Sequence, residues 1–527
     1  MSKTGCFEYD VLIIGSGISG LSCALAAEEA GLAVAVISKE ENISECNTFY
    51  AQGGIVARGV EDSPNLLSKD IMEAGDYLNY RSAVEDLADK GPGLVEELLI
   101  KKLGLEFCKN QKGEMDFTME AAHSCRRILH VKDKTGESIE KVLTSAVKAN
   151  KGIKIFNSHI AIDLITNTHN SRDSQDRYKA TRVLGAYVFD QTRDRVCTFF
   201  ASQVVLATGG VGDLFLHTSN PACATGDGVA MAARIGAEII NAEYIQFHPT
   251  ILYHRDVKRF LISESLRGEG AVLKNRFGEA FMKRYQPKLK DLAPRDEVAR
   301  AIFREIERTK SDYVYLDASA METDVEIRFP GIFNQCRKVG IDIRREGIPV
   351  VPAAHYFCGG VKVNLSGESS IPGLYAVGET ACTGVHGGNR LASVSLLEGL
   401  YYGHKAALDI AQKIAKPSER LKKSIPPWEF PQNEVEFDPI LISQDLTNIR
   451  NTMWNYAGIV RKYHRLERAQ SDLNYLSHRI EKFYKQAKLT RGIIELRNCL
   501  LTATVIVCSA FSNYTSIGAH YIEMPKN

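Results

Sequence analysis

The sequence predicts an α/β protein with a doubly wound parallel sheet, an α+β domain inserted into the sheet domain, and a C-terminal three-helix bundle. Three observations support this fold class. The N-terminal segment reads as strand 9–14, helix 18–30 and strand 33–37, a β-α-β unit typical of parallel sheets. Two later strand-like runs, 203–207 and 374–377, end in glycine and polar residues, so we expect one sheet built from distant segments. The third observation is helical periodicity near the C-terminus.

The proline-rich stretch 417–439 separates that helical region from the rest, because it holds five of the 16 prolines and proline ends a helix. We expect the sheet domain to comprise residues 1–241 and 356–417, the inserted domain 242–355, and the helical domain 418–527. Three apolar helix faces predict a bundle whose role is packing or subunit contact: Leu446, Ile449, Met453 and Val460; Leu473, Leu476, Ile480 and Phe483; Ile493, Leu496, Leu500, Ala503 and Val507.

Composition excludes several classes of protein. Lys and Arg total 65 and Asp and Glu total 64, which argues against a nucleic-acid binder because such proteins carry a basic excess. The twelve cysteines form no CxxC pair, so we expect no metal centre, and their scatter suits a reducing cytoplasm. No apolar run reaches about 18 residues and no signal-peptide core is visible, so we expect no membrane association.

The first β-α-β unit carries a glycine-rich turn with dinucleotide-binding spacing, Gly15-Ser16-Gly17-Ile18-Ser19-Gly20. The first glycine permits the tight turn, the second lets the backbone approach a pyrophosphate, and the third lets helix and strand pack closely. The N-terminus of the helix supplies free N–H groups to an anion. An acidic residue for a ribose is expected about 20 residues on. Ser38 and Lys39 stand there instead, which argues against plain NAD binding.

Four more segments are candidate cofactor contacts. The run Asn47-Thr48-Phe49-Tyr50-Ala51-Gln52-Gly53-Gly54 could approach a flat polar ring or form an ordinary turn. Asp227 precedes a helical stretch over 229–237 and could be its N-cap or contact a ribose or flavin. Glu379 follows a strand and could bind a ribose hydroxyl. Ser395 and Leu396 lie near the start of another helix, whose N-terminus could face the anionic edge of a reduced flavin.

Six ordered motifs give the chain a resemblance over nearly its whole length: residues 47–54, 246–250, 264–270, 294–300, His355 and 389–393. It resembles the succinate dehydrogenase/fumarate reductase flavoprotein family and, within it, is most similar to the L-aspartate oxidases. The resemblance implies a Rossmann-like FAD-binding domain, an inserted capping domain and a C4-dicarboxylate substrate. In respiratory members a histidine before the glycine-rich run carries covalent flavin; Asn47 stands here, which implies non-covalent FAD.

Several residues distinguish this chain within the family. Glu120, in the segment 119–130, matches the signature of the aspartate oxidases, and the run 518–521 resembles their terminal motif. The chain departs from the usual pattern at three positions: Cys125 replaces His, Val394 replaces Asn, and Ile517 replaces Arg.

The resemblance also implies roles for the substrate site. Arg390 and His355 would bind one carboxylate, and His248 and Ser263 the other, since charge-assisted hydrogen bonds are the strong ones. Arg295 matches the family's catalytic arginine, but arginine is a poor base, so proton shuttling and charge stabilisation both stay open. Glu264 and Arg267 could relay protons to it, and Glu120 could hold a substrate ammonium that succinate lacks.

The implied function is FAD-dependent oxidation of L-aspartate to iminoaspartate, with reoxidation by O2 or fumarate. This would be the first step of the quinolinate route to NAD, and the product would pass to quinolinate synthase. One alternative is a fumarate reductase or succinate dehydrogenase flavoprotein. Others are a flavin-binding scaffold without turnover and a nucleic-acid-modifying flavoprotein, which the set Arg295, His355 and Arg390 and the neutral charge disfavour.

Overall fold

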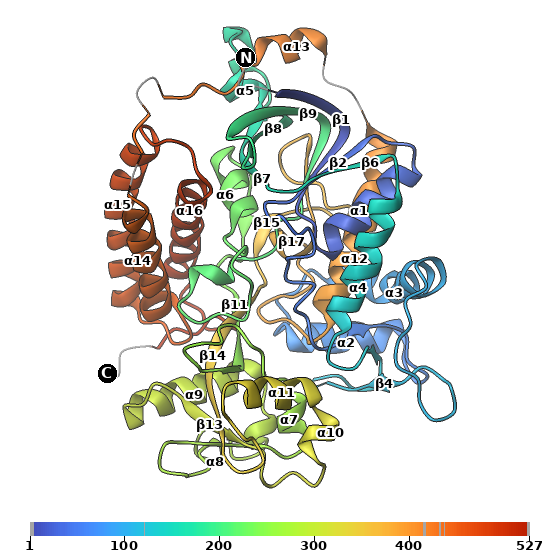
Figure 1. Cartoon of the computed structure of the whole chain (residues 1–527), viewed down its shortest axis with the longest axis vertical. Helices are drawn as coiled ribbons and strands as arrows, with labels where there is room; N and C mark the ends of the chain where they lie inside the picture. The colour runs from blue at the N-terminus through green and yellow to red at the C-terminus, as the bar shows by residue number, and fades with distance from the viewer. Residues whose placement is uncertain (1–4, 121, 415–417, 432–433, 437, 524–527) are drawn as a thin grey trace.

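The computed structural model describes residues 5–120, 122–414, 418–431, 434–436 and 438–523. A large sheet lies at one end of the molecule, a smaller sheet with its own helices lies at the opposite end, and the C-terminal helices stand along one side (Figure 1). The predicted α/β class with a C-terminal helical region is confirmed.

The large sheet has seven strands in the order β6-β2-β1-β9-β8-β7, with β16 pairing β9. Its parallel part contains β1 (Gly5–Ile14), β2 (Val34–Ile37), β6 (Ile153–Phe156), β9 (Arg195–Leu206) and β16 (Leu374–Ala376). The strands β7 (His159–Thr166) and β8 (Val183–Asp190) are antiparallel. The predicted parallel sheet is present, and the antiparallel strands β7 and β8 extend it beyond what was predicted. A short turn of four residues joins β8 to β9, and a short turn can only connect antiparallel strands.

Two helices, α1 (Ile18–Glu29) and α4 (Thr135–Ala149), lie against this sheet. Outside them α12 (Val394–Lys413) packs on α1, and α3 (Arg81–Leu94) packs on α12. A Cβ atom at Gly403 of α12 would lie 2.3 Å from the carbonyl oxygen of Ser19 on α1. A Cβ at Gly20 would lie 2.2 Å from the carbonyl of Gly15. The third glycine of the turn therefore has the predicted packing role.

The smaller sheet is antiparallel, in the order β11-β14-β13-β12. Its strands are β11 (Ile245–Leu252), β12 (Val272–Lys274), β13 (Val314–Asp317) and β14 (Ile348–Phe357), with helices α7 (Ser265–Gly268), α8 (Met282–Tyr285), α9 (Arg295–Thr309), α10 (Val325–Arg328) and α11 (Pro330–Lys338). It falls almost entirely within the expected insertion, although β14 runs two residues past 355. The exact domain boundaries stay a prediction.

The C-terminal helices are α14 (Pro439–Ala457), α15 (Tyr463–Tyr484) and α16 (Arg491–Ser512). Their apolar faces share one core with Val211, Phe215 and Phe247 of the rest of the chain. Val460 was wrongly placed on the first helix, because α14 ends before Gly458. By length and a hydropathy of 1.6, α16 could cross a membrane, but 61% of that stretch is buried, as in a core helix.

A short helix, α13 (Glu419–Ser424), interrupts the expected linker, whose first proline, Pro417, lies outside the described residues. The remaining elements are β3 (Ile55–Val56), α2 (Pro64–Ala74), a π-helix (Val95–Lys102), β4 (Phe117–Thr118), β5 (Ile128–Leu129), α5 (Asn167–Asn170), α6 (Asp227–Arg234), β10 (Ile239–Ile240), β15 (Gly360–Lys362), β17 (Ala381–Cys382) and four 3-10 turns (Ser174–Tyr178, Gly212–Leu214, Lys290–Leu292 and Gly378–Thr380).

Candidate functional site

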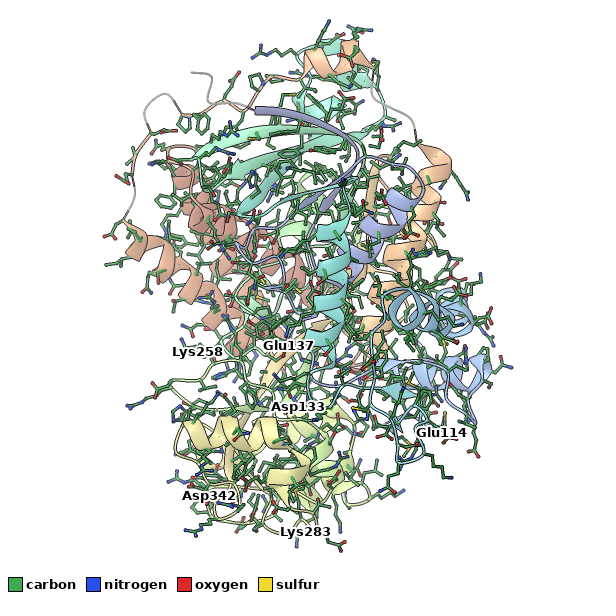
Figure 2. The ribbon with its side chains drawn as sticks, turned by 45° about the vertical axis from the view of Figure 1, so that its right-hand side comes forward. Glu114, Asp133, Glu137, Lys258, Lys283 and Asp342 are labelled. Carbon is green, nitrogen blue, oxygen red and sulfur yellow. The ribbon has the colours of Figure 1, made fainter. Side chains whose placement is uncertain are left out.

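One cavity of about 640 Å³ lies between the large sheet and the smaller one. All but two of the predicted site residues line it. The two exceptions are Gly20, which packs against the carbonyl of Gly15, and Arg267, which contacts Glu264 from outside the cavity. At the rim, Asp133 and Glu137 lie where α4 meets the helices of the smaller sheet (Figure 2). A Cβ at Gly331 of α11 would lie 1.9 Å from Asp133 Oδ2, so the two bodies meet closely at this rim.

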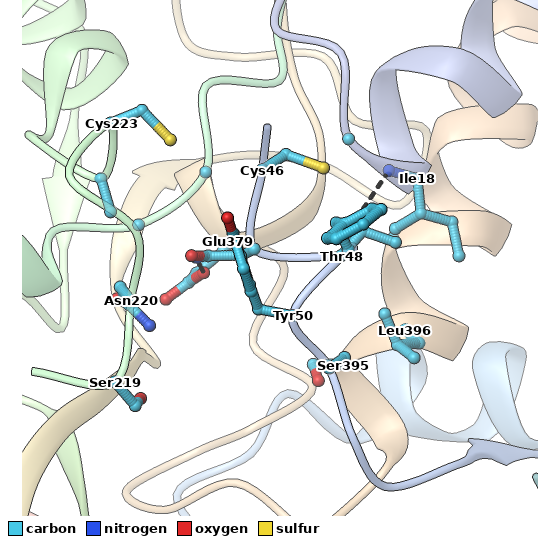
Figure 3. A pocket seen from close by; sticks show the side chains of 18 of the residues that line it. Ile18, Cys46, Thr48, Tyr50, Ser219, Asn220, Cys223, Glu379, Ser395 and Leu396 are labelled. Atoms are coloured by element: carbon cyan, nitrogen blue, oxygen red, sulfur yellow. Dashed lines mark hydrogen bonds between the residues drawn. The ribbon is translucent and has the colours of Figure 1, made fainter. Parts of the chain in front are cut away.

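The glycine turn forms a cradle at the N-terminus of α1. Gly15 has a φ of +118°, and a Cβ there would lie 2.0 Å from the carbonyl oxygen of Ala207, so only glycine fits. Ser16 Oγ donates to the carbonyl of Ile43 at 2.6 Å, and the amide of Ile18 donates to Thr48 Oγ1 at 3.0 Å (Figure 3). The turn and the 47–54 run thus form one wall.

The far end of the cavity is built around Lys39. Its ammonium bonds Asp227 Oδ2 at 2.7 Å, Thr225 Oγ1 at 2.6 Å and Glu495 Oε1 at 2.9 Å. Burial would raise the pKa of Asp227, but Lys39 outweighs it and holds that pKa below its usual value. The expected N-cap role of Asp227 was wrong, because Gly226, with a φ of +75°, is the N-cap and Asp227 begins α6.

Glu379 lines the cavity, and its side chain is held by two hydrogen bonds (Figure 3). Asn47 Nδ2 donates to its Oε2 at 2.8 Å, and the amide of Phe357 donates to its Oε1 at 2.9 Å. Burial raises the pKa of Glu379 to about 7. Asn47 Oδ1 is buried and has no hydrogen-bond partner among the described residues. A buried acceptor facing the cavity, together with a glycine-rich turn and a helix N-terminus, fits a dinucleotide such as FAD.

Arg390 is the main cation at the other end. Its Nη1 donates to Ser395 Oγ at 3.1 Å, its Nη2 donates to Gln246 Oε1 at 3.0 Å, and its guanidinium lies 4.7 Å from the centre of the Tyr356 ring. No carboxylate of the described residues lies within 4.0 Å of it, and its buried Nε lacks a partner among them. The group is therefore available for a carboxylate ligand.

Two neutral histidines face this end, His248 and His355, with ring centres 5.3 Å apart. Burial and the neighbouring arginines hold the pKa of both well below 6.5. The amide of Thr250 donates to His248 Nδ1 at 3.2 Å, which places the imidazole proton on Nε2. His355 Nδ1 is 2.7 Å from Ser219 Oγ. His248 can thus donate a hydrogen bond from Nε2 without adding charge, and His355 can do the same when Ser219 donates to its Nδ1.

Arg295 begins α9 and is paired with Glu264. Its Nε lies 2.6 Å from Glu264 Oε2, and Arg267 Nη2 lies 3.6 Å from Glu264 Oε1. Burial would raise the pKa of Glu264, but Arg295 and Arg267 hold it below its usual value. Burial would lower the pKa of Arg295, but Glu264 and then Glu120 outweigh it and raise that pKa. Arg295 therefore keeps its proton firmly. Ser263 lines the cavity beside this pair.

Glu120 reaches the same cavity from the loop before β5. Ser393 Oγ donates to its Oε2 at 2.7 Å, and a Cβ at Gly53 would lie 2.8 Å from its Oε1. Ser393 has a φ of +59°, a strained conformation for a non-glycine residue. Sequence reasoning gave Ser393, Gln246 and Tyr356 no role in the site, although the first two belong to motifs that it named and Tyr356 follows His355.

The comparisons with known proteins agree with this geometry. Residues 10–396 match the FAD binding domain family, and residues 446–524 match the fumarate reductase flavoprotein C-terminal family. An L-aspartate oxidase of Acinetobacter baylyi is 42% identical over 98% of this chain and 94% of its own length. A chloroplastic L-aspartate oxidase of Arabidopsis thaliana is 37% identical over 98% of this chain and 81% of its own.

A solved structure also shares the whole architecture. The FrdA chain of E. coli quinol fumarate reductase, at 27% identity, superposes with a TM-score of 0.86 over 99% of this chain and 92% of that one. The family and cofactor expected from the motifs are confirmed. The chain belongs to the L-aspartate oxidases, a branch of the succinate dehydrogenase/fumarate reductase flavoproteins that bind FAD.

Proposed function

We propose that this protein oxidises L-aspartate to iminoaspartate with FAD as its bound oxidant, and that O2 or fumarate restores the oxidised cofactor. The reaction is the first step of the quinolinate route to NAD, and its product passes to quinolinate synthase. The observation that carries the proposal is Glu120, an anion that reaches the end of the cavity where Arg390 and the Arg295–Glu264 pair lie. A ligand with two carboxylates and one ammonium matches that set of charges. The twelve unpaired cysteines support a cytoplasmic location.

The residues divide the substrate between them. Arg390 and His355 hold one carboxylate, since both face the same end of the cavity and, among the residues described, Arg390 bonds only neutral oxygens. His248 Nε2–H and Ser263 hold the other. Glu120 holds the ammonium, which selects an amino acid over succinate. FAD, when bound, would accept the Cα hydrogen together with its electron pair, and the ammonium would first release a proton so that the neutral amine becomes the imine.

Of the two roles left open for Arg295, the structure favours charge stabilisation. A proton shuttle must release its proton, but Glu264 and Glu120 raise the pKa of Arg295 above an already high value. Arg295 therefore stays a cation beside the reacting carbon, and Glu264 holds its guanidinium in place at 2.6 Å. Arg267 in turn is held by the carbonyl of Asp291 at 2.5 Å and positions Glu264 from behind.

Anaerobic addition of substrate tests the proposal directly. L-Aspartate should bleach the flavin absorbance of the purified protein, and O2 or fumarate should restore it, whereas L-glutamate and succinate should not bleach it at comparable rates. Turnover of succinate without turnover of aspartate would favour the fumarate reductase-type alternative, which the similarity to the FrdA chain suggests. Asn47 supports non-covalent FAD, so the flavin should separate from the chain on denaturation.

A further inference from the structure

The C-terminal helix α16 contacts the cofactor end of the cavity, far along the chain from the region that matches the FAD binding domain family, which ends at residue 396. Two residues that line this end, Lys39 and Asp227, are each bonded to α16. Glu495 Oε1 lies 2.9 Å from Lys39 Nζ, and Asn498 Nδ2 donates to Asp227 Oδ1 at 2.9 Å. Neither Glu495 nor Asn498 lines the cavity itself.

These contacts are themselves held in place. Arg491 Nε lies 3.0 Å from Glu495 Oε1, and its guanidinium also pairs with Glu40, the residue after Lys39. Arg234 Nη1 donates to Asn498 Oδ1 at 2.8 Å, which fixes the amide so that its NH2 group faces Asp227. The set forms a closed network of charge-assisted hydrogen bonds, the kind that rigidifies its members.

The backbone before Asp227 rests on the same helix. Thr502 Oγ1 donates to the carbonyl of Gly226 at 3.0 Å, and a Cβ at Gly226 would lie 2.7 Å from Thr502 Cγ2. The loop that presents Asp227 therefore sits directly on α16. Displacing α16 would release Lys39, Asp227 and their loop together.

We propose that α16 is part of the FAD site: Glu495 and Asn498 are positioning residues that hold Lys39 and Asp227 in their FAD-binding geometry. The inference rests on FAD being the cofactor and does not depend on the substrate. It gives the C-terminal bundle a role in cofactor binding beyond the packing role expected from its sequence. By linkage, FAD binding and docking of α16 onto the large sheet stabilise each other.

The direction in which Glu495→Gln changes the Kd for FAD distinguishes a positioning role from a purely electrostatic one. The network contains three cations, Lys39, Arg491 and Arg234, and three carboxylates, those of Asp227, Glu495 and Glu40. FAD carries a pyrophosphate dianion, so removing one carboxylate would tighten binding if only the local field mattered. Positioning predicts the opposite, because Lys39 then loses one of its two anionic partners.

The experiment titrates FAD into apo-protein and follows the quenching of flavin fluorescence. We expect Glu495→Gln to raise the Kd for FAD about tenfold, and Glu467→Gln, at an exposed site on α15, to leave it unchanged. In a Lys39→Gln background, Glu495→Gln should cause little further loss, because both changes remove the same interaction. An unchanged or lower Kd for Glu495→Gln, or full additivity with Lys39→Gln, would overturn the proposal.

Two further measurements keep the test independent of folding. The unfolding temperature of each apo variant shows whether α16 is still docked. If α16 is no longer docked in Glu495→Gln, two other variants take its place, Asn498→Ser and Asn498→Ala. Serine can keep a donor toward Asp227 and alanine cannot, so Asn498→Ala should bind FAD more weakly than Asn498→Ser. In the unaltered protein, FAD should slow amide hydrogen exchange across residues 491–502. Exchange there that FAD leaves unaffected would contradict the mutual stabilisation.

Discussion

Replacing Glu120 by glutamine is the sharpest test of the substrate assignment. Coulomb's law gives about 4 kcal/mol between a carboxylate and an ammonium at about 4 Å and an effective dielectric constant of about 20. Glutamine keeps an oxygen acceptor and can still accept from Ser393, so only the charged part is lost, about 1.5–3 kcal/mol. That loss corresponds to a fall of about 10- to 150-fold in kcat/KM for L-aspartate.

The same change should act in the opposite direction on succinate. Succinate has no ammonium, so Glu120 only repels it, and glutamine should lower the succinate inhibition constant while it raises the KM for aspartate. Both constants come from initial rates of aspartate oxidation with succinate as competitor. A parallel loss for both ligands would mean that Glu120 merely supports the cavity, and unchanged kinetics would refute its contact with the ammonium.

Three further substitutions have defined outcomes. Arg390→Lys should lower kcat/KM for aspartate at least about 100-fold, because lysine cannot keep the bonds to Ser395 and Gln246 while binding a carboxylate; near-normal kinetics would exclude Arg390 from that role. Ser393→Ala should raise the KM for aspartate roughly three- to tenfold and leave succinate inhibition unchanged, because it frees Glu120 to move; an equal effect on both ligands would indicate general disruption. Burial raises the pKa of Glu140 to about 8, so the stability this carboxyl gives when protonated is lost as pH rises from about 4.5 through 8. Glu140→Gln should therefore raise the free energy of unfolding at pH 8.5 by on the order of 2–4 kcal/mol and change it little at pH 5, which the unfolding temperature at each pH would show. A gain at pH 5 as large as the gain at pH 8.5 would contradict the assignment.

Local patterns carried the sequence-based predictions of the fold. The unit from β1 to β2 was predictable because its apolar strands and the glycine turn between them all lie within 33 residues of sequence. The antiparallel β7 and β8 were not predicted, since a run of apolar residues does not specify which strand lies beside it. The end of α14 was misplaced because the apolar Val460 fits the helical spacing even though the chain has already turned at Gly458.

The site shows the same limit at the level of side chains. Motif order located Arg390 and Glu120, but the contacts that orient them, from Gln246 and Ser393, cross about 140 and 270 residues of sequence. Periodicity along one helix cannot reveal such contacts. For the same reason the sequence left Asp227 open between a helix cap and a cofactor contact, because its partner, Lys39, lies 188 residues away.

Charge at the substrate end accounts for the choice of ligand. The described groups there include three cations, Arg267, Arg295 and Arg390, and two anions, Glu264 and Glu120, while both histidines are neutral. These five groups sum to one positive charge, and uncompensated charge is costly in a poorly solvated cavity. Aspartate, with two carboxylates and one ammonium, brings a single net negative charge that offsets this sum. Succinate brings two negative charges and leaves one in excess beside the Glu120 carboxylate. The arginines could bind any dicarboxylate, and it is the charge of Glu120 that makes the site favour the amino acid.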